Sequence, residues 1–206
     1  MDASRKHAQT RALVLASASP RRREILGQLG VTFRVVPSGI DESMHPGETP
    51  ERHVQRLARE KASEVRRRLC DDPTRPIVLA ADTIVLIDGQ VLGKPQDDVD
   101  ALRMLQLLSG RVHRVLTALA VCEVAGPHEA AALFSTEVRF RELDASSAAA
   151  YVASGEGRDK AGSYAIQGLG AGLVQGIAGS YTNVVGMPAA ETIDLLRDAG
   201  VLASWP

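Results

Sequence analysis

Short apolar runs separated by polar turns predict a set of buried β-strands along this chain. Six such runs stand out, at Leu13–Ala16, Val31–Val36, Ile77–Ala81, Ile84–Ile87, Arg111–Val121 and Ser135–Arg141. Asp88-Gly89 fits a hairpin turn that sends Val91 and Leu92 back antiparallel. Glu123–Ala132 is expected to be a variable turn, and Ile177–Val185 a pair of strands around Gly179.

Apolar residues at helical spacing predict amphipathic helices between these strands. The stretches are the one that follows Pro20, Pro50 to about Leu69, Asp97–Leu108, Ala145–Ser154 and a final one opened by Met187-Pro188 and ending near Leu196. Ser109-Gly110 provides a stop signal for the third of them.

Composition describes an ordinary soluble globular protein of 206 residues, with 45% hydrophobic residues, 24% charged residues and a net charge of -1. That charge lacks the basic excess of a general nucleic-acid binder, and 3% aromatic residues argue against a base-stacking platform. Two cysteines, Cys70 and Cys122, predict neither a disulfide framework nor a zinc site. With no signal-peptide core or membrane span, we expect a cytoplasmic protein, in which residues 1–12 are a polar extension and residues 13–206 the folded domain.

A turn with phosphate-binding groups joins the first strand to the first helix. Ser17 and Ser19 place hydroxyls and amides at the helix start, and Arg21 and Arg22 follow in its first turn. Cations at a helix N-terminus oppose its dipole unless an anion lies between them, so this turn points to a bound phosphate. Against this stands a serine-capped surface helix with solvated arginines.

Two further charged residues interrupt apolar patterns. Lys61 falls four residues after Leu57, at the edge of the inward-facing stripe of its helix, where it would either face a site or snorkel to water. Asp82 interrupts a long apolar run, so its carboxylate is either hydrogen-bonded structurally or faces a cation or water in a cavity. Glu42 follows a strand end, and the hairpin brings Lys94 toward the same neighbourhood.

A glycine-rich stretch, residues 159–170, lets the backbone approach a ligand closely or simply makes turns. It matches neither a Walker A loop nor a dinucleotide fingerprint. Cations and two carboxylates, Glu42 and Asp82, are together the groups that cleavage of a phosphoanhydride requires, and Mg²⁺ is satisfied by one or two carboxylates with substrate oxygens.

Several separated motifs, in order, resemble the Maf family of nucleoside triphosphate pyrophosphatases from about Leu13 to Leu196. They are Ser-Ala-Ser-Pro-Arg-Arg at 17–22, Arg-Glu-Lys-Ala at 59–62, Ala-Asp-Thr at 81–83, Gly-Lys-Pro at 93–95, Leu-Ser-Gly at 108–110 with His113, Asp-Lys-Ala-Gly at 159–162, Ile-Gln-Gly at 166–168 and Gly-Ser-Tyr at 179–181. Ala18, Met187 and the polar extension are mild departures from the family pattern.

The resemblance implies an α/β fold related to the inosine triphosphate pyrophosphatases, with a long mixed twisted sheet, flanking helices and two lobes around a central cleft. It implies hydrolysis of a nucleoside triphosphate to the monophosphate and pyrophosphate with Mg²⁺ or Mn²⁺, in a homodimer. Asp-Thr at 82 and 83 and Ile-Gln-Gly at 166–168 resemble the branch that acts on dTTP and UTP, including modified pyrimidine nucleotides, rather than on 7-methyl-GTP.

Roles follow position by position from that resemblance. Asp82 matches the proton acceptor, while Arg21, Thr83 and Gln167 match specificity positions. The phosphate and metal site is matched by Ser19, Arg22, Glu42, Lys61 and Lys94, with Asp82 and Glu42 as the expected metal ligands and Ser17 beside the substrate. A nucleotide-sensing regulator of septum formation that does not turn its ligand over is the alternative. Retention of Asp82 and both lysines disfavours it.

Overall fold

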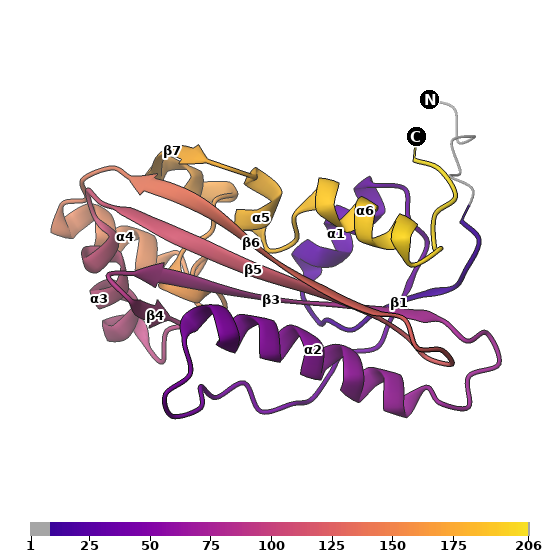
Figure 1. Ribbon diagram of the computed structural model, residues 1–206. Coiled ribbons are helices and arrows are strands. Elements are labelled where there is room, and N and C mark those ends of the chain that lie inside the picture. The colour runs from indigo at the N-terminus through magenta and orange to yellow at the C-terminus, as the bar shows by residue number, and fades with distance from the viewer. Residues whose placement is uncertain (1–8, 206) are drawn as a thin grey trace. The chain divides into compact units, whose positions relative to one another are not determined.

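A seven-stranded mixed sheet with helices around it forms the framework of the computed structural model, which describes residues 9–205 (Figure 1). The strands are β1 (Leu13–Leu15), β2 (Arg34–Val35), β3 (Ile77–Ile87), β4 (Gln90–Leu92), β5 (Val112–Glu123), β6 (Glu129–Phe140) and β7 (Val174–Ala178). Their order is β2-β1-β3-β5-β6-β7, with β4 also paired to β3. β1 is parallel to β2 and β3, whereas β4 and β7 are antiparallel to their neighbours. The predicted α/β fold with a mixed sheet is confirmed.

Four of the helices, α1 to α4, start where polar caps occur in the sequence. The helices are α1 (Pro20–Gln28), α2 (Pro50–Arg68), α3 (Asp98–Leu108), α4 (Ala145–Ala153), α5 (Tyr181–Val185) and α6 (Ala189–Asp198), with the 3₁₀ turns η1 (Ala161–Ser163) and η2 (Gly168–Leu173). The side chains of Ser19, Thr49, Asp97 and Asp144 each accept a hydrogen bond from the amide three residues later. None of the helices within residues 9–205 has the length and apolar character needed to span a membrane.

Contacts divide the chain into two compact units. The first unit holds the described residues up to Asp82, Ala118–Leu133 and the chain from Gly186 onward, and the second holds Thr83–Thr117 and Phe134–Val185. β3, β5 and β6 each contribute residues to both units. Two compact units agree with the expected two lobes, while the expected cleft between them stays a prediction.

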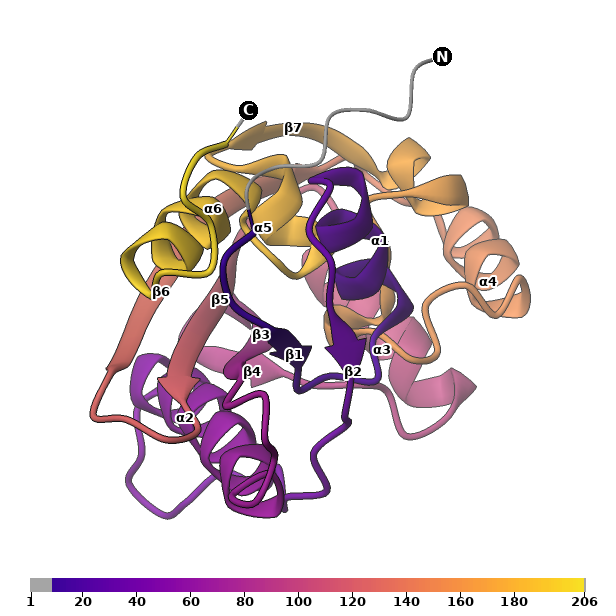
Figure 2. The ribbon, with the colours of Figure 1, turned by 90° about the vertical axis from the view of Figure 1, so that its right-hand side faces the viewer.

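In the first unit, β1 lies between β2 and the start of β3 (Figure 2). Its residues Leu13–Leu15 are fully buried, as a strand with neighbours on both sides requires. α2 turns a stripe at helical spacing inward, and this stripe contains His53, Val54, Leu57, Ala58, Lys61, Ala62 and Val65. The Cys122 thiol on β5 lies 3.6 Å from the carbonyl oxygen of Ala62, so α2 packs against this strand.

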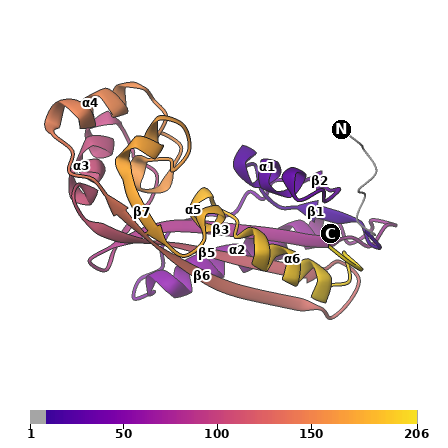
Figure 3. The same ribbon diagram turned by 90° about the horizontal axis from the view of Figure 1, so that it is seen from above.

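In the second unit, α3 and α4 lie together, as Figure 3 shows from above. Their apolar sides pack with residues of β3, β4, β5 and β6 around a core that includes Leu105, Leu108, Val138 and Phe140. Within this core the rings of His113, Phe140 and Tyr164 meet edge to face, with centroids 4.7–5.4 Å apart.

Three predicted strands differ from the structure. The strand expected over Val31–Val36 is only Arg34–Val35, because the amide of Val31 is still bonded to the carbonyl of Leu26 in the turn that ends α1. The two runs on either side of Asp82 form one continuous strand, since an acid with a buried partner does not interrupt pairing.

The turn expected over Glu123–Ala132 is present but shorter than predicted, at residues 124–128, because β5 reaches Glu123 and β6 already begins at Glu129. The alanines at 130–132 have low strand propensity, and pairing with β5 overrides it.

The strand pair expected over Ile177–Val185 is wrong. β7 ends at Ala178, and the short helix α5 follows. Gly179 takes a φ of +127°, and the Ser180 hydroxyl accepts a hydrogen bond from the backbone N–H of Asn183 at 3.2 Å. This local cap starts a helical turn within a β-branched sequence.

Candidate functional site

A buried ammonium group bridges two carboxylates in the first unit. The Nζ atom of Lys61 lies 2.6 Å from Oε1 of Glu42 and 2.7 Å from Oδ1 of Asp82. Lys61 and Asp82 are 7% and 6% exposed, whereas the Glu42 side chain is half exposed. Three residues from three distant segments therefore form one charged cluster, and the snorkelling alternative for Lys61 is wrong.

The local structure places each member. Lys61 belongs to the buried stripe of α2, so the helix itself directs its side chain inward. Asp82 lies on β3 between Ala81 and Thr83, and all three are held by strand geometry. Glu42 comes from the long loop between β2 and α2. The adjacent ammonium offsets part of the cost of burying a carboxylate at this position.

Arg22 is the second cation of this region, and it contacts the protein backbone. Its Nε donates to the carbonyl of Gly186 at 2.9 Å, and its Nη1 donates to the carbonyl of Ala81 at 2.8 Å and to the Ser17 hydroxyl at 3.2 Å. Burial lowers the pKa of Arg22, while the charges of Asp82 and Glu42 oppose that shift. The guanidinium therefore ties α1 to β3 and to the segment before α6 beside the Lys61 cluster.

The serine turn has the predicted form. Ser17 Oγ accepts from the Ser19 amide at 3.2 Å, and Ser19 Oγ accepts from the Arg22 amide at 3.4 Å as the N-cap of α1. Parallel pairing of Leu13 with Ile77 and Leu15 with Leu79, continued by two residues, brings Ser17 level with Ala81, next to Asp82.

Arg22 is not a solvated surface arginine, because its Nε and Nη1 donate hydrogen bonds to backbone carbonyls. Arg21, one residue earlier in α1, is half-buried and close enough for its charge to lower the pKa of Arg22. The two cations at the start of α1 are where the sequence predicts them, and the anion site between them stays a prediction.

The remaining predicted residues belong to the second unit. Thr83 is half-buried, and its hydroxyl lies 3.0 Å from that of Thr117. Lys94 is exposed on the loop after β4, and Gln167 is half-buried between η1 and η2. The Gly162 amide donates to the Gly93 carbonyl at 3.0 Å, so the motif at 159–162 supports the loop that carries Lys94.

Sequence reasoning missed a buried polar network behind Thr83. The Thr117 hydroxyl donates to the backbone carbonyl of Asn183 at 3.1 Å. The side-chain amide of Asn183 donates to the Val115 carbonyl and to the Thr136 hydroxyl. Thr117 and Asn183 are fully buried. The available signal was Thr117 itself, a polar residue inside the apolar run of β5 that must find a partner.

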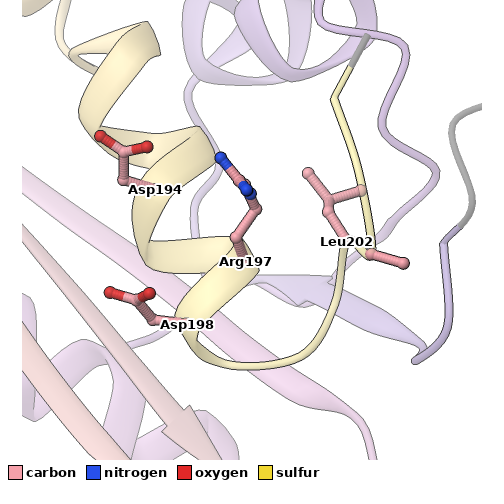
Figure 4. Close-up of a pocket in the computed structure, with 5 residues that line it drawn as sticks. Asp194, Arg197, Asp198 and Leu202 are labelled. Atoms are coloured by element: carbon pink, nitrogen blue, oxygen red, sulfur yellow. The ribbon is translucent and has the colours of Figure 1, made fainter.

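A surface hollow of about 500 Å³ lies on α6 and the chain after it, lined by Asp194, Arg197, Asp198, Leu202 and Ala203 (Figure 4). None of the predicted site residues lines it. Its lining residues belong to none of the motifs from which the sequence predicts the site, so the proposed chemistry stays with the Lys61 cluster.

Comparison with known proteins agrees with the motifs. Residues 12–199 match the family model described as Maf-like protein. The chain is 53% identical to the dTTP/UTP pyrophosphatase of Anaeromyxobacter sp. (strain Fw109-5), over 94% of this chain and 92% of that protein. It is 50% identical to the protein of the same name from Shewanella oneidensis, over 92% of this chain and 99% of that protein. A solved structure, that of the Staphylococcus aureus Ham1 protein, is similar with a TM-score of 0.42 and 13% identity, over 63% of this chain and 72% of that one. By its match to the family model over nearly its whole length, the chain belongs to the Maf family.

Proposed function

We propose that this chain hydrolyses dTTP and UTP to the corresponding monophosphate and pyrophosphate. The observation that carries the proposal is its identity of 50% or more, over more than nine-tenths of its length, to relatives named dTTP/UTP pyrophosphatase. The geometry of the first unit supports it, because a buried ammonium and two carboxylates lie together there and cleavage of a phosphoanhydride uses groups of both kinds.

In the proposed mechanism, Asp82 orients a water molecule and accepts its proton as the water oxygen attacks the α-phosphorus. The bond between the α-phosphorus and the oxygen that bridges to the β-phosphorus breaks, and pyrophosphate leaves with the electron pair. Lys61 holds Asp82 in place through its 2.7 Å contact. The Ser17–Arg22 turn and Lys94 bind phosphate oxygens through amides, hydroxyls and positive charge.

The two carboxylates also suit a divalent cation. Asp82 and Glu42 approach the same ammonium, so they lie close enough to share an ion, and Mg²⁺ needs only one or two carboxylates when substrate oxygens complete its shell. Residues 9–205 contain no group of three or more histidine, cysteine or acidic side chains placed to hold a metal by themselves. When bound, Mg²⁺ or Mn²⁺ would neutralise charge on the phosphate oxygens and on the leaving pyrophosphate.

Pyrimidine preference is proposed to depend chiefly on Gln167. The amide of Gln167 offers a donor and an acceptor to the edge of a uracil or thymine ring. Thr83, fixed by Thr117, and Arg21 in the first unit complete the proposed specificity positions. The homodimer implied by the family resemblance is a separate proposal, which analytical ultracentrifugation checks.

A substrate panel tests the proposed activity. Pyrophosphate release is measured from dTTP, UTP, 7-methyl-GTP and ATP with Mg²⁺, with Mn²⁺ and with chelator, and we expect dTTP and UTP to be preferred and the chelator to abolish turnover. Preference for 7-methyl-GTP would contradict the branch assignment. Tight nucleotide binding without pyrophosphate would favour the sensing regulator.

Asp82→Asn tests the proton acceptor. We expect turnover of dTTP and UTP to fall about 10²–10⁴-fold, the usual loss for a positioned acid or base. Asp88→Asn is the matched control, since Asp88 lies in the hairpin turn with a φ of +49°, which asparagine also adopts. Undiminished turnover in Asp82→Asn, with far-ultraviolet circular dichroism unchanged, would remove Asp82 from the mechanism.

A further inference from the structure

The loop that presents Gln167 has no regular structure of its own. It runs between the 3₁₀ turns η1 and η2, and Gly168 and Gly170 follow Gln167. A glycine-rich segment of this kind adopts many conformations unless other groups hold it. A side chain that reads a base needs a fixed backbone beneath it.

The carboxylate of Glu156 binds backbone amides of η2, just after this loop. Its Oε2 accepts a hydrogen bond from the Leu169 amide at 2.9 Å, and its Oε1 accepts from the Gly170 amide at 2.8 Å. Burial would raise the pKa of Glu156, but these two amides, the Tyr151 hydroxyl and the charge of Lys160 hold it below its ordinary value. Glu156 therefore remains an acceptor for both amides at neutral pH.

Tyr151 binds the backbone before Gln167, and with Glu156 it forms what we call the Glu156–Tyr151 clamp. Its hydroxyl donates to Oε1 of Glu156 at 3.0 Å and accepts from the Ala165 amide at 3.0 Å. Tyr151 is 6% exposed and belongs to the core of the second unit on α4. The two side chains thus fix backbone amides on both sides of Gln167, and they tie them to a helix.

The backbone lies so close to Glu156 and Tyr151 that two positions in this segment have no room for a side chain. A Cβ atom on Gly168, which has a φ of +64°, would lie 2.4 Å from Oε2 of Glu156. A Cβ atom on Gly170 would lie 2.0 Å from the Ala165 carbonyl oxygen and 2.8 Å from the Tyr151 hydroxyl. The two glycines let the backbone close tightly on the Glu156–Tyr151 clamp.

We propose that Glu156 and Tyr151 are positioning residues that fix the amide of Gln167 and so set the preference for pyrimidine triphosphates. This inference rests on the proposed function, because it assigns the base-reading role to Gln167. Neither residue touches the phosphates in this scheme, so their loss acts on recognition of the base and leaves the Lys61 cluster intact.

The variants are Glu156→Gln, which keeps the shape but turns an NH₂ group toward an amide, and Tyr151→Phe, which removes the hydroxyl. Asp98→Asn is the matched control, because it weakens an exposed ion pair with Arg158 in the same unit and leaves the loop alone. Hydrogen exchange at Leu169 and Gly170 for Glu156→Gln, and at Ala165 for Tyr151→Phe, is read by mass spectrometry or NMR and reports the clamp without any turnover.

For both variants we expect faster exchange of these amides and a rise of about tenfold in KM for UTP, with kcat changed by less than about threefold, the pattern of lost substrate binding. The ratio of kcat/KM for UTP over ATP should fall by about tenfold, and Gln167→Ala should lower it to the same extent. The double variant Tyr151→Phe with Gln167→Ala should fall no further, because both act through one side chain.

Each outcome decides the proposal. Unchanged exchange in both variants overturns the clamp, whatever the activity. Faster exchange with an unchanged UTP to ATP ratio overturns its role in selectivity, and an additive double variant overturns action through Gln167. If the wild type releases no pyrophosphate from dTTP or UTP, the proposed function fails on its own, and the selectivity is then read from the affinities of UTP and ATP.

Discussion

At the scale of single residues, the chemistry depends on a lysine placed in the apolar stripe of a helix. Lys61 shares that stripe with Leu57, Ala58 and Val65, yet it is 7% exposed and contacts two carboxylates. Burying one charge without a partner costs several kcal/mol, so Lys61 and Asp82 depend on each other for stability. Because each charge compensates the other, a variant that removes both is expected to recover stability without recovering activity.

Lys61→Met leaves Asp82 buried without its ammonium, and we expect the free energy of unfolding in urea to fall by about 3–5 kcal/mol. Arg59→Met, on the exposed side of α2, is the control and should change stability by less than about 0.5 kcal/mol.

Replacing both partners, as in Lys61→Met with Asp82→Leu, leaves no unpaired charge. This double variant should recover most of the lost free energy of unfolding, but it should release no pyrophosphate. A double variant as unstable as Lys61→Met would show that the pair is not coupled as its geometry indicates.

Arg22 gives the second residue-scale prediction. Arg22→Met leaves the carbonyls of Ala81 and Gly186 without their donors, and each buried unsatisfied group costs about 1–3 kcal/mol. For two such groups we therefore expect a loss of about 2–6 kcal/mol in urea unfolding. Arg23→Met, exposed on the same helix, should be nearly neutral. Equal stabilities of the two variants would show that Arg22 is a surface residue after all.

At the scale of elements, one turn supports the loop after β4. Gly162 in η1 has a φ of +69°, donates to the Gly93 carbonyl and leaves a Cβ only 3.0 Å from the Val85 side chain. The motif at 159–162 is thus a structural support for the Gly93-Lys94-Pro95 loop. A left-handed backbone pressed against a neighbour is the reason that glycine is required here.

Gly162→Ala should lower the free energy of unfolding by about 1–2 kcal/mol from the left-handed conformation alone, with any rearrangement around Val85 adding to it. Gly172→Ala is the matched control, since an added Cβ there meets nothing within 4 Å. Thermal unfolding followed by circular dichroism compares the two, and a Gly162→Ala protein as stable as the control would exclude the strain.

At the scale of the whole molecule, stability depends on pH through a buried histidine. His113 is 1% exposed, its Nε2 lies 2.8 Å from the Tyr164 hydroxyl, and burial lowers its pKa to about 4 from the ordinary 6.5. The unfolded chain takes up the proton first as the pH falls. Stability is therefore complete above about pH 6.5, falls toward pH 4 and loses about 3 kcal/mol in that window.

Urea unfolding at several values of pH between 7 and 4 checks this prediction. His113→Gln removes the imidazole and should flatten the curve between pH 6.5 and 4, although it also lowers stability at every pH through lost packing. Losses below about pH 4 belong to carboxylates with lowered pKa values, such as Asp144, whose pKa is held at about 2 by the amide of Ser147 and by neighbouring serine hydroxyls. An equally steep curve in the variant would assign the effect to another group.

The sequence by itself determined the local features. Polar caps followed by helical periodicity placed α2, α3 and α4 within a residue or two, and Asp88-Gly89 gave the hairpin between β3 and β4. These features depend on groups a few residues apart, which a single stretch of sequence contains. The ordered motifs fixed the Maf family for the same reason, because each motif is itself local in the chain.

Only the tertiary structure decided which partners the charged groups find. Arg22 donates to a carbonyl 164 residues away, and Lys61 joins acids from a loop and a strand on either side of it in sequence. Pairing extended β6 through its alanines, and a serine cap made α5 a helix where β-branched residues favoured a strand. Local propensity is worth tenths of a kcal/mol per residue, roughly, so contacts between distant segments override it wherever they satisfy buried polar groups.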